Sequence, residues 1–159
     1  MLQKFQYHIQ QNFSFLQDKK LLVATSGGMD SMVLVDLFQK LKFDFAIAHC
    51  NFQLRESESD GDENFVKEYA KSNNINCFIT KFDTEKYYKE HKLSTQLAAR
   101  KLRYDWFNEI LEQEKFDYIV TAHHADDVVE TFMINLSRGT GLDGLTGIPS
   151  QNGNIIRPL

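Results

Sequence analysis

Cysteine is scarce in this sequence, which has 159 residues and two thiols. Cys50 and Cys77 stand far apart and form no Cys-x-x-Cys pair, which argues against a disulfide framework and against a structural zinc site. Long hydrophobic runs are missing too, since no unbroken apolar segment is long enough to cross a bilayer. The opening residues, MLQKFQYH, lack the apolar core of a signal peptide. We therefore expect a cytoplasmic protein with no membrane partner.

Positive charge is also in short supply. The chain has 18 Lys and Arg against 22 Asp and Glu, a formal net charge of -4. Tight contact with a phosphate backbone normally needs clustered Lys and Arg, so the overall charge does not indicate a nucleic-acid-binding protein. An RNA partner would need a local basic patch or a further segment of chain. The length suits one domain with its own core and is too short for two ordinary domains.

Strand-like and helix-like segments alternate along the chain. Short apolar runs are followed by stretches in which apolar residues recur every three or four positions, the spacing of an amphipathic helix. The expected strands are 20–25, 43–49, 75–82 and 116–122, and the expected helices are 1–18, 32–42, 57–73, 94–114 and 126–138. This order predicts an α/β fold, with a doubly wound, Rossmann-like parallel sheet and helices on both faces.

The connections carry expectations of their own. Residues 50–56 and 83–92 are longer or more polar than a minimal turn and are expected to be loops of the kind that often carry function. Asn152-Gly153 favours a hairpin turn. The chain stops at residue 159 where a further strand is under way. We therefore expect one domain over residues 1–159, truncated at its C-terminal end, with further domains beyond it.

An anion cradle is predicted between an expected strand and an expected helix, at Ser26, Gly27, Gly28, Met29, Asp30 and Ser31. Adjacent glycines allow a sharp turn, and hydroxyls with free N–H groups at a helix start bind phosphate oxygens. A Walker A lysine is missing, so the loop suits a pyrophosphate that leaves intact better than a transferred γ-phosphate. Asp30 would repel phosphate unless a cation such as Mg²⁺ bridged the two. The alternative, a Gly-Gly turn without a ligand, does not need two serines and an acid in this order.

A second polar group follows the strand 116–122, in the stretch HHADDVVET from His123 to Thr131. Asp127, Glu130 and Thr131 are spaced i, i+3 and i+4 and share one face of the expected helix. Acids at a helix start also complement the helix dipole, so capping is the alternative role for Asp127. The His-His-x-Asp-Asp order fits metal ligation only weakly, because it lacks a third fixed partner.

Basic side chains lie on one stripe of the expected helix 94–114. Gln96, Arg100 and Arg103 are spaced i, i+4 and i+7, so two guanidinium groups lie beside an amide. Such a stripe can meet phosphates or a cytidine, but the residues alone favour the alternative, a solvated helix face. The segment 49–55 follows a strand at the edge of the sheet where ligands of doubly wound folds gather. A binding role and an ordinary polar loop are both open for that segment.

Residues 139–144, GTGLDG, fit the Gly-x-Gly-x-x-Gly pattern of dinucleotide-binding loops. They follow an expected helix instead of a strand, and therefore lack the geometry of such a site. NAD binding is not expected.

The loop SGGMDS matches every fixed position of the SGGxDS motif of PP-loop ATPases, which cleave ATP between the α and β phosphates and adenylate a substrate oxygen. Residues 123–147, with HHADD, ET and RGTG, resemble tRNA(Ile)-lysidine synthases, and the similarity extends to 49–55 and 98–104. It covers most of the chain, although Val128 stands where Gln is frequent. The resemblance implies transfer of free L-lysine to C2 of the wobble cytidine of a tRNA(Ile) with a CAU anticodon, while ATP yields AMP and pyrophosphate.

The same resemblance implies roles for individual residues. Asp127 and Glu130 would bind the lysine ammonium, and the loop 26–31 would hold the pyrophosphate with Asp30 near the metal ion. Arg100 joins these three acids as a residue needed for turnover. The implied substrate-binding set is His49, Asn51, Arg55, Arg103, His123, Asp127, Glu130 and Thr131.

Two other functions stay open at this point. A PP-loop tRNA 2-thiolation enzyme shares part of the stretch 123–131, but such enzymes use cysteine clusters, whereas this chain has only Cys50 and Cys77. A non-catalytic ATP-binding module needs only the glycine cradle, yet has little use for the carboxylates of Asp127 and Glu130 near a triphosphate. The sequence does not determine the oligomeric state, and a homodimer is kept as one option.

Overall fold

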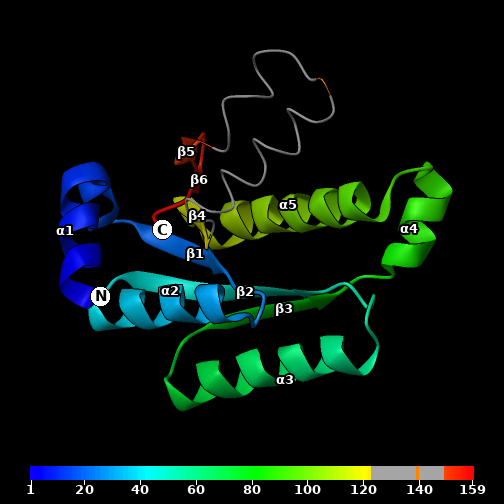
Figure 1. Cartoon of the computed structure of the whole chain (residues 1–159), viewed down its shortest axis with the longest axis horizontal. Coiled ribbons are helices and arrows are strands. Elements are labelled where there is room, and N and C mark those ends of the chain that lie inside the picture. Colours follow the sequence, from blue (N-terminus) through cyan, green and yellow to red (C-terminus); the bar gives the residue numbers. More distant parts are fainter. Residues whose placement is uncertain (123–138, 140–148) are drawn as a thin grey trace.

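A six-stranded sheet forms the centre of the computed structural model, which describes residues 1–122, 139 and 149–159. The strands lie in the order β3-β2-β1-β4-β6-β5 (Figure 1). They are β1 (Lys20–Ala24), β2 (Asp44–Asn51), β3 (Cys77–Lys81), β4 (Tyr118–Thr121), β5 (Gln151–Asn152) and β6 (Ile155–Ile156). Neighbouring strands are parallel except β5 and β6. The predicted α/β fold is confirmed, with one antiparallel strand at the edge.

The antiparallel edge is the hairpin that the Asn-Gly pair predicted. Gly153 has a φ of 58°, in the left-handed region that hairpin turns require. The strand expected near the end of the chain is β6, which lies parallel to β4 with Ile119 opposite Ile155. The hairpin therefore extends the sheet beyond β4.

Helices cover both faces of the sheet. They are α1 (Leu2–Asn12), the 3-10 turn η1 (Ser14–Leu16), α2 (Met29–Lys40), α3 (Ser57–Ser72), α4 (Thr84–His91) and α5 (Thr95–Glu114). Phe38 of α2 and Val66 of α3 belong to the core on one face, and Phe107 of α5 belongs to the core on the other (Figure 1). No helix in the described ranges combines the length and apolar character needed to span a membrane. The predicted helix 126–138 lies outside the described residues.

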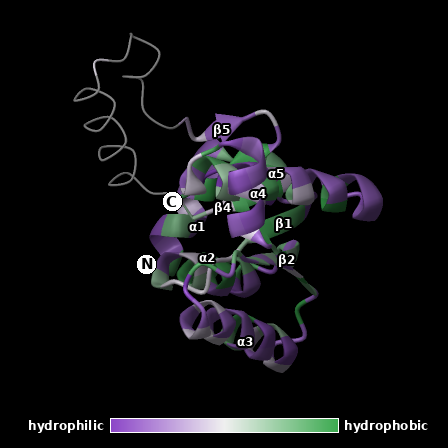
Figure 2. Ribbon diagram, turned by 90° about the vertical axis from the view of Figure 1, so that its right-hand side faces the viewer, coloured by the Kyte–Doolittle hydropathy of each residue, from purple (hydrophilic) through white to green (hydrophobic). Residues whose placement is uncertain are grey.

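The central strand β1 contributes to both cores. Leu21 and Val23 face α2, Leu22 faces α5, and all three are fully buried. A parallel strand covered on both faces needs apolar side chains at successive positions, which explains the run Leu-Leu-Val. Figure 2 shows hydrophobic residues gathered on β1 and β4, whereas α4 is largely hydrophilic.

The prediction of a loop over residues 83–92 is wrong, because residues 84–91 form α4. The side chain of Asp83 caps this helix by accepting a hydrogen bond from the N–H of Lys86 at 3.1 Å. Exposed ion pairs at i, i+4 spacing, between Lys89 and Glu85 and between Lys86 and Glu90, add modest support. A helix with so few apolar residues gives almost no periodic signal, so only its cap could have identified it.

Candidate nucleotide-binding site

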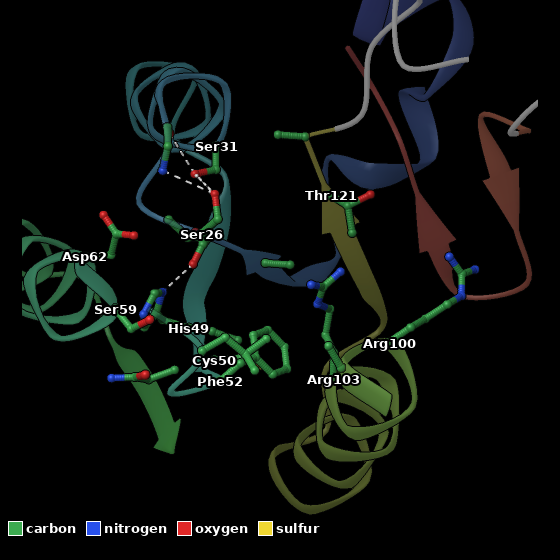
Figure 3. A pocket seen from close by; sticks show the side chains of 18 of the residues that line it. Ser26, Ser31, His49, Cys50, Phe52, Ser59, Asp62, Arg100, Arg103 and Thr121 are labelled. Carbon is green, nitrogen blue, oxygen red and sulfur yellow. Dashed lines mark hydrogen bonds between the residues drawn. The ribbon is translucent and has the colours of Figure 1, made fainter. Parts of the chain in front are cut away.

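A cavity lies at the carboxyl ends of β1, β2 and β4. In the sheet, β2 and then β3 lie on one side of β1. The next strand in the chain, β4, follows α5 and lies on the other side of β1. The strand order therefore reverses between β1 and β4, and ligands of doubly wound sheets bind at such a switch point. The cavity has a volume of about 840 Å³, within the range of small-molecule sites. Its walls are the loop after β1, the segment after β2, α3 and α5 (Figure 3).

The predicted anion cradle forms one of these walls. Gly28 is the N-cap of α2, and its N–H donates to Ser26 Oγ at 3.2 Å. Ser31 Oγ donates to the Gly28 carbonyl at 2.9 Å and lies 3.2 Å from Ser26 Oγ. These contacts, visible in Figure 3, fix the loop in one conformation. Ser31 is buried and serves mainly this internal bonding, whereas Ser26 and Gly28 are exposed at the cavity.

The first turn of α2 supplies the electrostatics of the cradle. The N–H groups of a helix N-terminus have no partners within the helix, and together with the helix dipole they favour an anion. Asp30 lies in this first turn and lines the cavity beside Met29, which is 83% exposed. Carboxylate and phosphate oxygens are the donors that Mg²⁺ prefers. The loop and Asp30 thus fit a polyphosphate accompanied by Mg²⁺.

Gly27 occupies a position that only glycine suits. Its φ is 91°, and a Cβ added there would lie 3.2 Å from the Cβ of Asp62 on α3. The loop therefore packs closely against α3, and Asp62 lines the cavity. Sequence analysis did not identify Asp62, because an acid within a highly charged helix carries no distinguishing signal.

His49 lies beneath the loop and is 2% exposed. Its Nδ1 is 2.7 Å from the carbonyl oxygen of Thr25, and the Thr25 N–H donates to the carbonyl of Ala48 at 2.9 Å. Since a carbonyl can only accept, Nδ1 carries the proton. Among the described residues, the buried Nε2 has no hydrogen-bond partner. His49 thus supports the end of β1 from which the cradle leaves, and its predicted contact with substrate stays a prediction.

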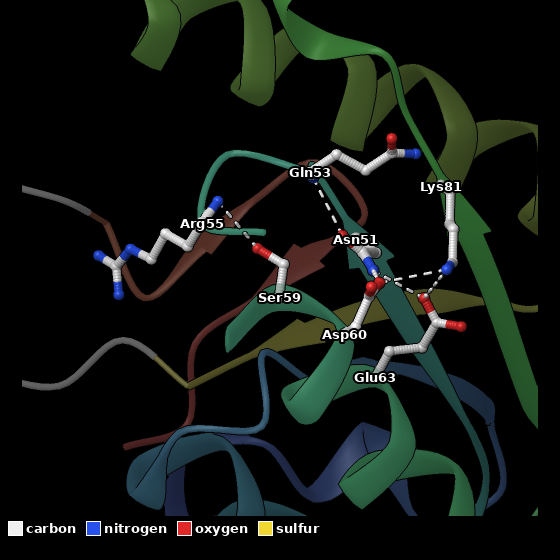
Figure 4. A network of polar contacts seen from close by, with 7 residues as sticks. All are labelled: Asn51, Gln53, Arg55, Ser59, Asp60, Glu63 and Lys81. Atoms are coloured by element: carbon white, nitrogen blue, oxygen red, sulfur yellow. Dashed lines mark hydrogen bonds and ion pairs between the residues drawn. The ribbon is translucent and has the colours of Figure 1, made fainter. Parts of the chain in front are cut away.

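Asn51 ends β2 and is 1% exposed. Its Nδ2 donates to Asp60 at 2.9 Å and to Glu63 at 2.8 Å, and its Oδ1 accepts from the Gln53 N–H at 3.0 Å (Figure 4). These contacts occupy the donors of the amide, so Asn51 is positioned to support the loop after β2. Arg55, in that loop, lines the cavity with an exposed side chain.

Two arginines of α5 line the wall opposite the cradle (Figure 3). The guanidinium of Arg103 lies over the ring of Phe52 at 5.2 Å, and that of Arg100 lies over Tyr104 at 5.3 Å. Within the described part of the chain, neither guanidinium pairs with a carboxylate. Gln96 lines the same wall, as the predicted stripe requires. This wall therefore presents two positively charged side chains to the cavity.

The two cysteines have little thiolate character. Burial raises the pKa of Cys50 from 9.0 to about 12, although the nearby charge of Arg103 opposes the rise. Burial likewise raises the pKa of Cys77 to about 11. Both thiols are protonated near neutral pH, whereas reactive cysteines need the thiolate.

Four predicted substrate-binding residues lie outside the described residues, so their roles stay predictions: His123, Asp127, Glu130 and Thr131. Within the described ranges, no three His, Cys, Asp or Glu side chains are placed to hold a metal ion. Several cavity residues lie outside the predicted motifs and were not predicted, namely Thr25, Ser59, Asp62 and Thr121. Of these, Thr121 could have been found from its place at the end of an expected strand.

The sequence is similar to named proteins of several bacteria. The family model for the PP-loop domain matches residues 1–159. The chain is 47% identical over 152 residues to the tRNA(Ile)-lysidine synthase of Bacteroides thetaiotaomicron, a match that covers 96% of this chain and 36% of that protein. It is 42% identical over 159 residues to the synthase of Parabacteroides distasonis, covering 100% of this chain and 36% of that protein. The chain thus spans about a third of the length of these relatives.

Solved structures share the fold. The U34-tRNA thiolase NcsA from Methanococcus maripaludis matches with a TM-score of 0.73 and 19% identity, over 99% of this chain and 59% of that one. The NH3-dependent NAD synthetase from Campylobacter jejuni matches with a TM-score of 0.62 and 15% identity, over 87% and 59% of the two chains. At such identities these likenesses show the fold alone. Because the family match runs through the whole chain and its motif forms the cradle at the switch point, we conclude that this chain belongs to the PP-loop family.

Proposed function

We propose that this chain is the nucleotide-binding domain of a tRNA(Ile)-lysidine synthase. The relatives named above support the substrate class. The observation that carries the chemistry is the opposition of the loop 26–31 and the guanidinium groups of Arg100 and Arg103 across one cavity. An anion cradle that faces two guanidinium groups suits the polyphosphate of ATP on one side and a phosphate or base of the second substrate on the other.

In the first step of the proposed reaction, O2 of the wobble cytidine attacks the α-phosphorus of ATP. The bond between that phosphorus and its bridging oxygen breaks, and pyrophosphate leaves. The exposed Ser26 hydroxyl and the N–H groups at the start of α2 donate to the departing oxygens, where negative charge develops. Mg²⁺ held by Asp30 would neutralise part of the phosphate charge.

In the second step an unprotonated amine of lysine attacks C2 of the adenylated cytidine, the bond from C2 to the oxygen breaks so that AMP leaves with that oxygen, and the attacking nitrogen releases a proton to solvent. Asp127 and Glu130 would bind the lysine ammonium, since their two carboxylates complement its charge. Arg100 and Arg103 would hold the negatively charged AMP moiety against α5 until it departs.

The thiolation alternative is less well supported. The thiolase that shares the fold is only 19% identical to this chain, and a likeness at that identity does not indicate a shared substrate. The raised pKa values of Cys50 and Cys77 leave both described thiols protonated at neutral pH. The lysidine reaction requires no reactive cysteine and is therefore preferred.

ATP-dependent transfer of labelled lysine to unmodified tRNA(Ile) tests the proposal, using the full-length gene product with AMP quantified alongside. We expect equal amounts of labelled tRNA and AMP, and a loss of both by at least about a hundredfold in Asp30→Ala. Asp36→Ala is the matched control, because Asp36 lies on the same helix but pairs with Lys40 on the exposed surface. Its activity should stay within about twofold of wild type. AMP formation without lysine transfer would reject the lysidine assignment.

A cytoplasmic location belongs to the same proposal, because tRNA and free lysine meet in the cytoplasm. A homodimer is also proposed, and sedimentation equilibrium of the full-length product would measure it.

A further inference from the structure

We propose that Asn51, Asp60, Glu63 and Lys81 form a positioning cluster that fixes the loop 52–56 and so presents Arg55 to a phosphate group of the tRNA. This inference rests on the proposed function, since it assigns the loop to that substrate. The four side chains come from the ends of β2 and β3 and from the start of α3 (Figure 4).

In the cluster, the Lys81 ammonium offsets part of the charge of the two carboxylates that surround one buried amide. Lys81 Nζ lies 3.2 Å from Asp60 Oδ1 and 3.7 Å from Glu63 Oε2, the carboxylate oxygens that also accept from Asn51. Asn51 and Lys81 are cross-strand partners in the parallel register, so both point toward α3. The hydrogen bonds from Asn51 and Lys81 lower the pKa of Asp60. Two carboxylates one helical turn apart would repel each other without these donors.

The loop held by this cluster has a strained backbone. Gln53 and Glu56 have φ values of 54° and 41°, in a region that residues with side chains rarely adopt. The N–H of Gln53 donates to Asn51, and the N–H of Arg55 donates to Ser59 Oγ at 3.2 Å. Strained backbone persists only where the surroundings enforce it, and it gathers at functional sites. A loop that only joined β2 to α3 would not require positive φ values at Gln53 and Glu56.

The loop places one weakly held positive charge at the mouth of the cavity. The Arg55 side chain is 78% exposed, and its only ion pair among the described residues, with Glu58, spans 3.9 Å. An exposed pair at that distance is readily exchanged for a phosphate. The neighbouring start of α3 is acidic, with Glu58 and Asp60 in its first turn. These acids would repel the phosphates of a tRNA. The Arg55 guanidinium must therefore be held in a defined position to attract them.

A double-mutant cycle in the full-length protein tests this coupling. Arg55→Ala should raise the KM for tRNA on the order of fivefold, as expected for one lost phosphate contact, and leave the KM for ATP unchanged. Asn51→Leu should raise the KM for tRNA by a similar factor. The double variant should be no worse than the poorer single variant, because Asn51 acts through Arg55. Lys81→Met should give a smaller rise of about threefold, and Lys86→Met, which removes an exposed ion pair on α4, should give none.

Amide hydrogen exchange supplies a second readout that does not depend on the substrate. In Asn51→Leu and Lys81→Met, exchange should accelerate in residues 52–56 and stay unchanged in β1. The proposal would be overturned if the effects of Asn51→Leu and Arg55→Ala on the KM for tRNA multiplied in the double variant. It would also be overturned if the KM for ATP rose as much as the KM for tRNA, or if amide exchange in residues 52–56 did not change. If the wild-type protein transfers no lysine, the proposed function fails. The cycle is then run on Kd values for unmodified tRNA, and the exchange measurement still decides whether the cluster fixes the loop.

Discussion

At the scale of single residues, the candidate site depends on backbone conformation as much as on functional groups. Gly27 combines a left-handed φ with close packing of the cradle against α3. His49, by contrast, supports the same loop from below through the Thr25 carbonyl. The cradle is thus held from two sides by residues that need not touch the ligand.

Gly27→Ala should destabilise the protein by roughly 1–3 kcal/mol and weaken ATP binding, because alanine would be strained at this φ and would crowd Asp62. Urea denaturation and ATP titration measure the two effects. Gly61→Ala is the control, since a Cβ at that helical position meets nothing within 4 Å. It should stabilise the protein by about 0.5–1 kcal/mol. Unchanged stability and ATP affinity in Gly27→Ala would contradict this account.

Cys50 should react slowly with iodoacetamide in the folded protein. Its pKa is raised to about 12, so the thiolate fraction at pH 8 is far below that of the urea-unfolded chain. The folded form should become relatively less stable as pH rises from 9.0 toward about 12, because the unfolded thiol ionises first. Alkylation rates are measured by mass spectrometry, with Cys77 followed in parallel. Equal rates in folded and unfolded protein would show that Cys50 is accessible and ionised.

At the scale of elements, α5 carries the arginine wall and depends on its cap. Ser94 Oγ accepts from the N–H of Leu97 at 3.2 Å, and the C-cap residue Lys115, just after the helix, has a left-handed φ of 56°. Arg100 and Arg103 lie within the first half of this helix. Order at its N-terminus therefore affects how both guanidinium groups face the cavity.

Ser94→Ala should cost about 1 kcal/mol of stability, the usual effect of a lost N-cap. Ser94→Gly is the matched comparison, because glycine is tolerated at this position and should cost only a few tenths of that amount. Chemical denaturation of both variants gives the difference. Equal losses would mean that the hydroxyl does not cap α5.

The strands and the larger helices were predictable because their apolar residues follow the period of each element. The polar helix α4 lacked that pattern and was missed. The cradle was also predictable, since its motif is local and continuous from Ser26 to Ser31. The contacts of Asp62 with Gly27, and of Arg103 with Phe52, join segments far apart in the chain, and no local pattern encodes them.

At the scale of the whole molecule, strand order determines where chemistry is possible. In the order β3-β2-β1-β4, the chain leaves β1 toward β2 on one side, whereas β4 lies on the other side. The cavity therefore lies at the carboxyl ends of β1 and β4. Alternating segments predicted a parallel sheet, but this order depends on non-local pairing that the sequence pattern does not specify. The acidic α3 and the basic stripe of α5 then face the cavity from opposite sides, which explains how a chain of net charge -4 presents a positive wall.

β4 and β6 are parallel neighbours, so the chain must return from the carboxyl end of one to the amino end of the other. The return begins at Ala122, on the cavity wall, and includes the predicted lysine-binding residues Asp127 and Glu130. Its two anchor points belong to the sheet, and changing the length of such a connection alters the closure entropy only slowly. Under the proposed function, the lysine contacts of Asp127 and Glu130 can therefore change within this one segment while the ATP cradle, built on another strand, stays as it is.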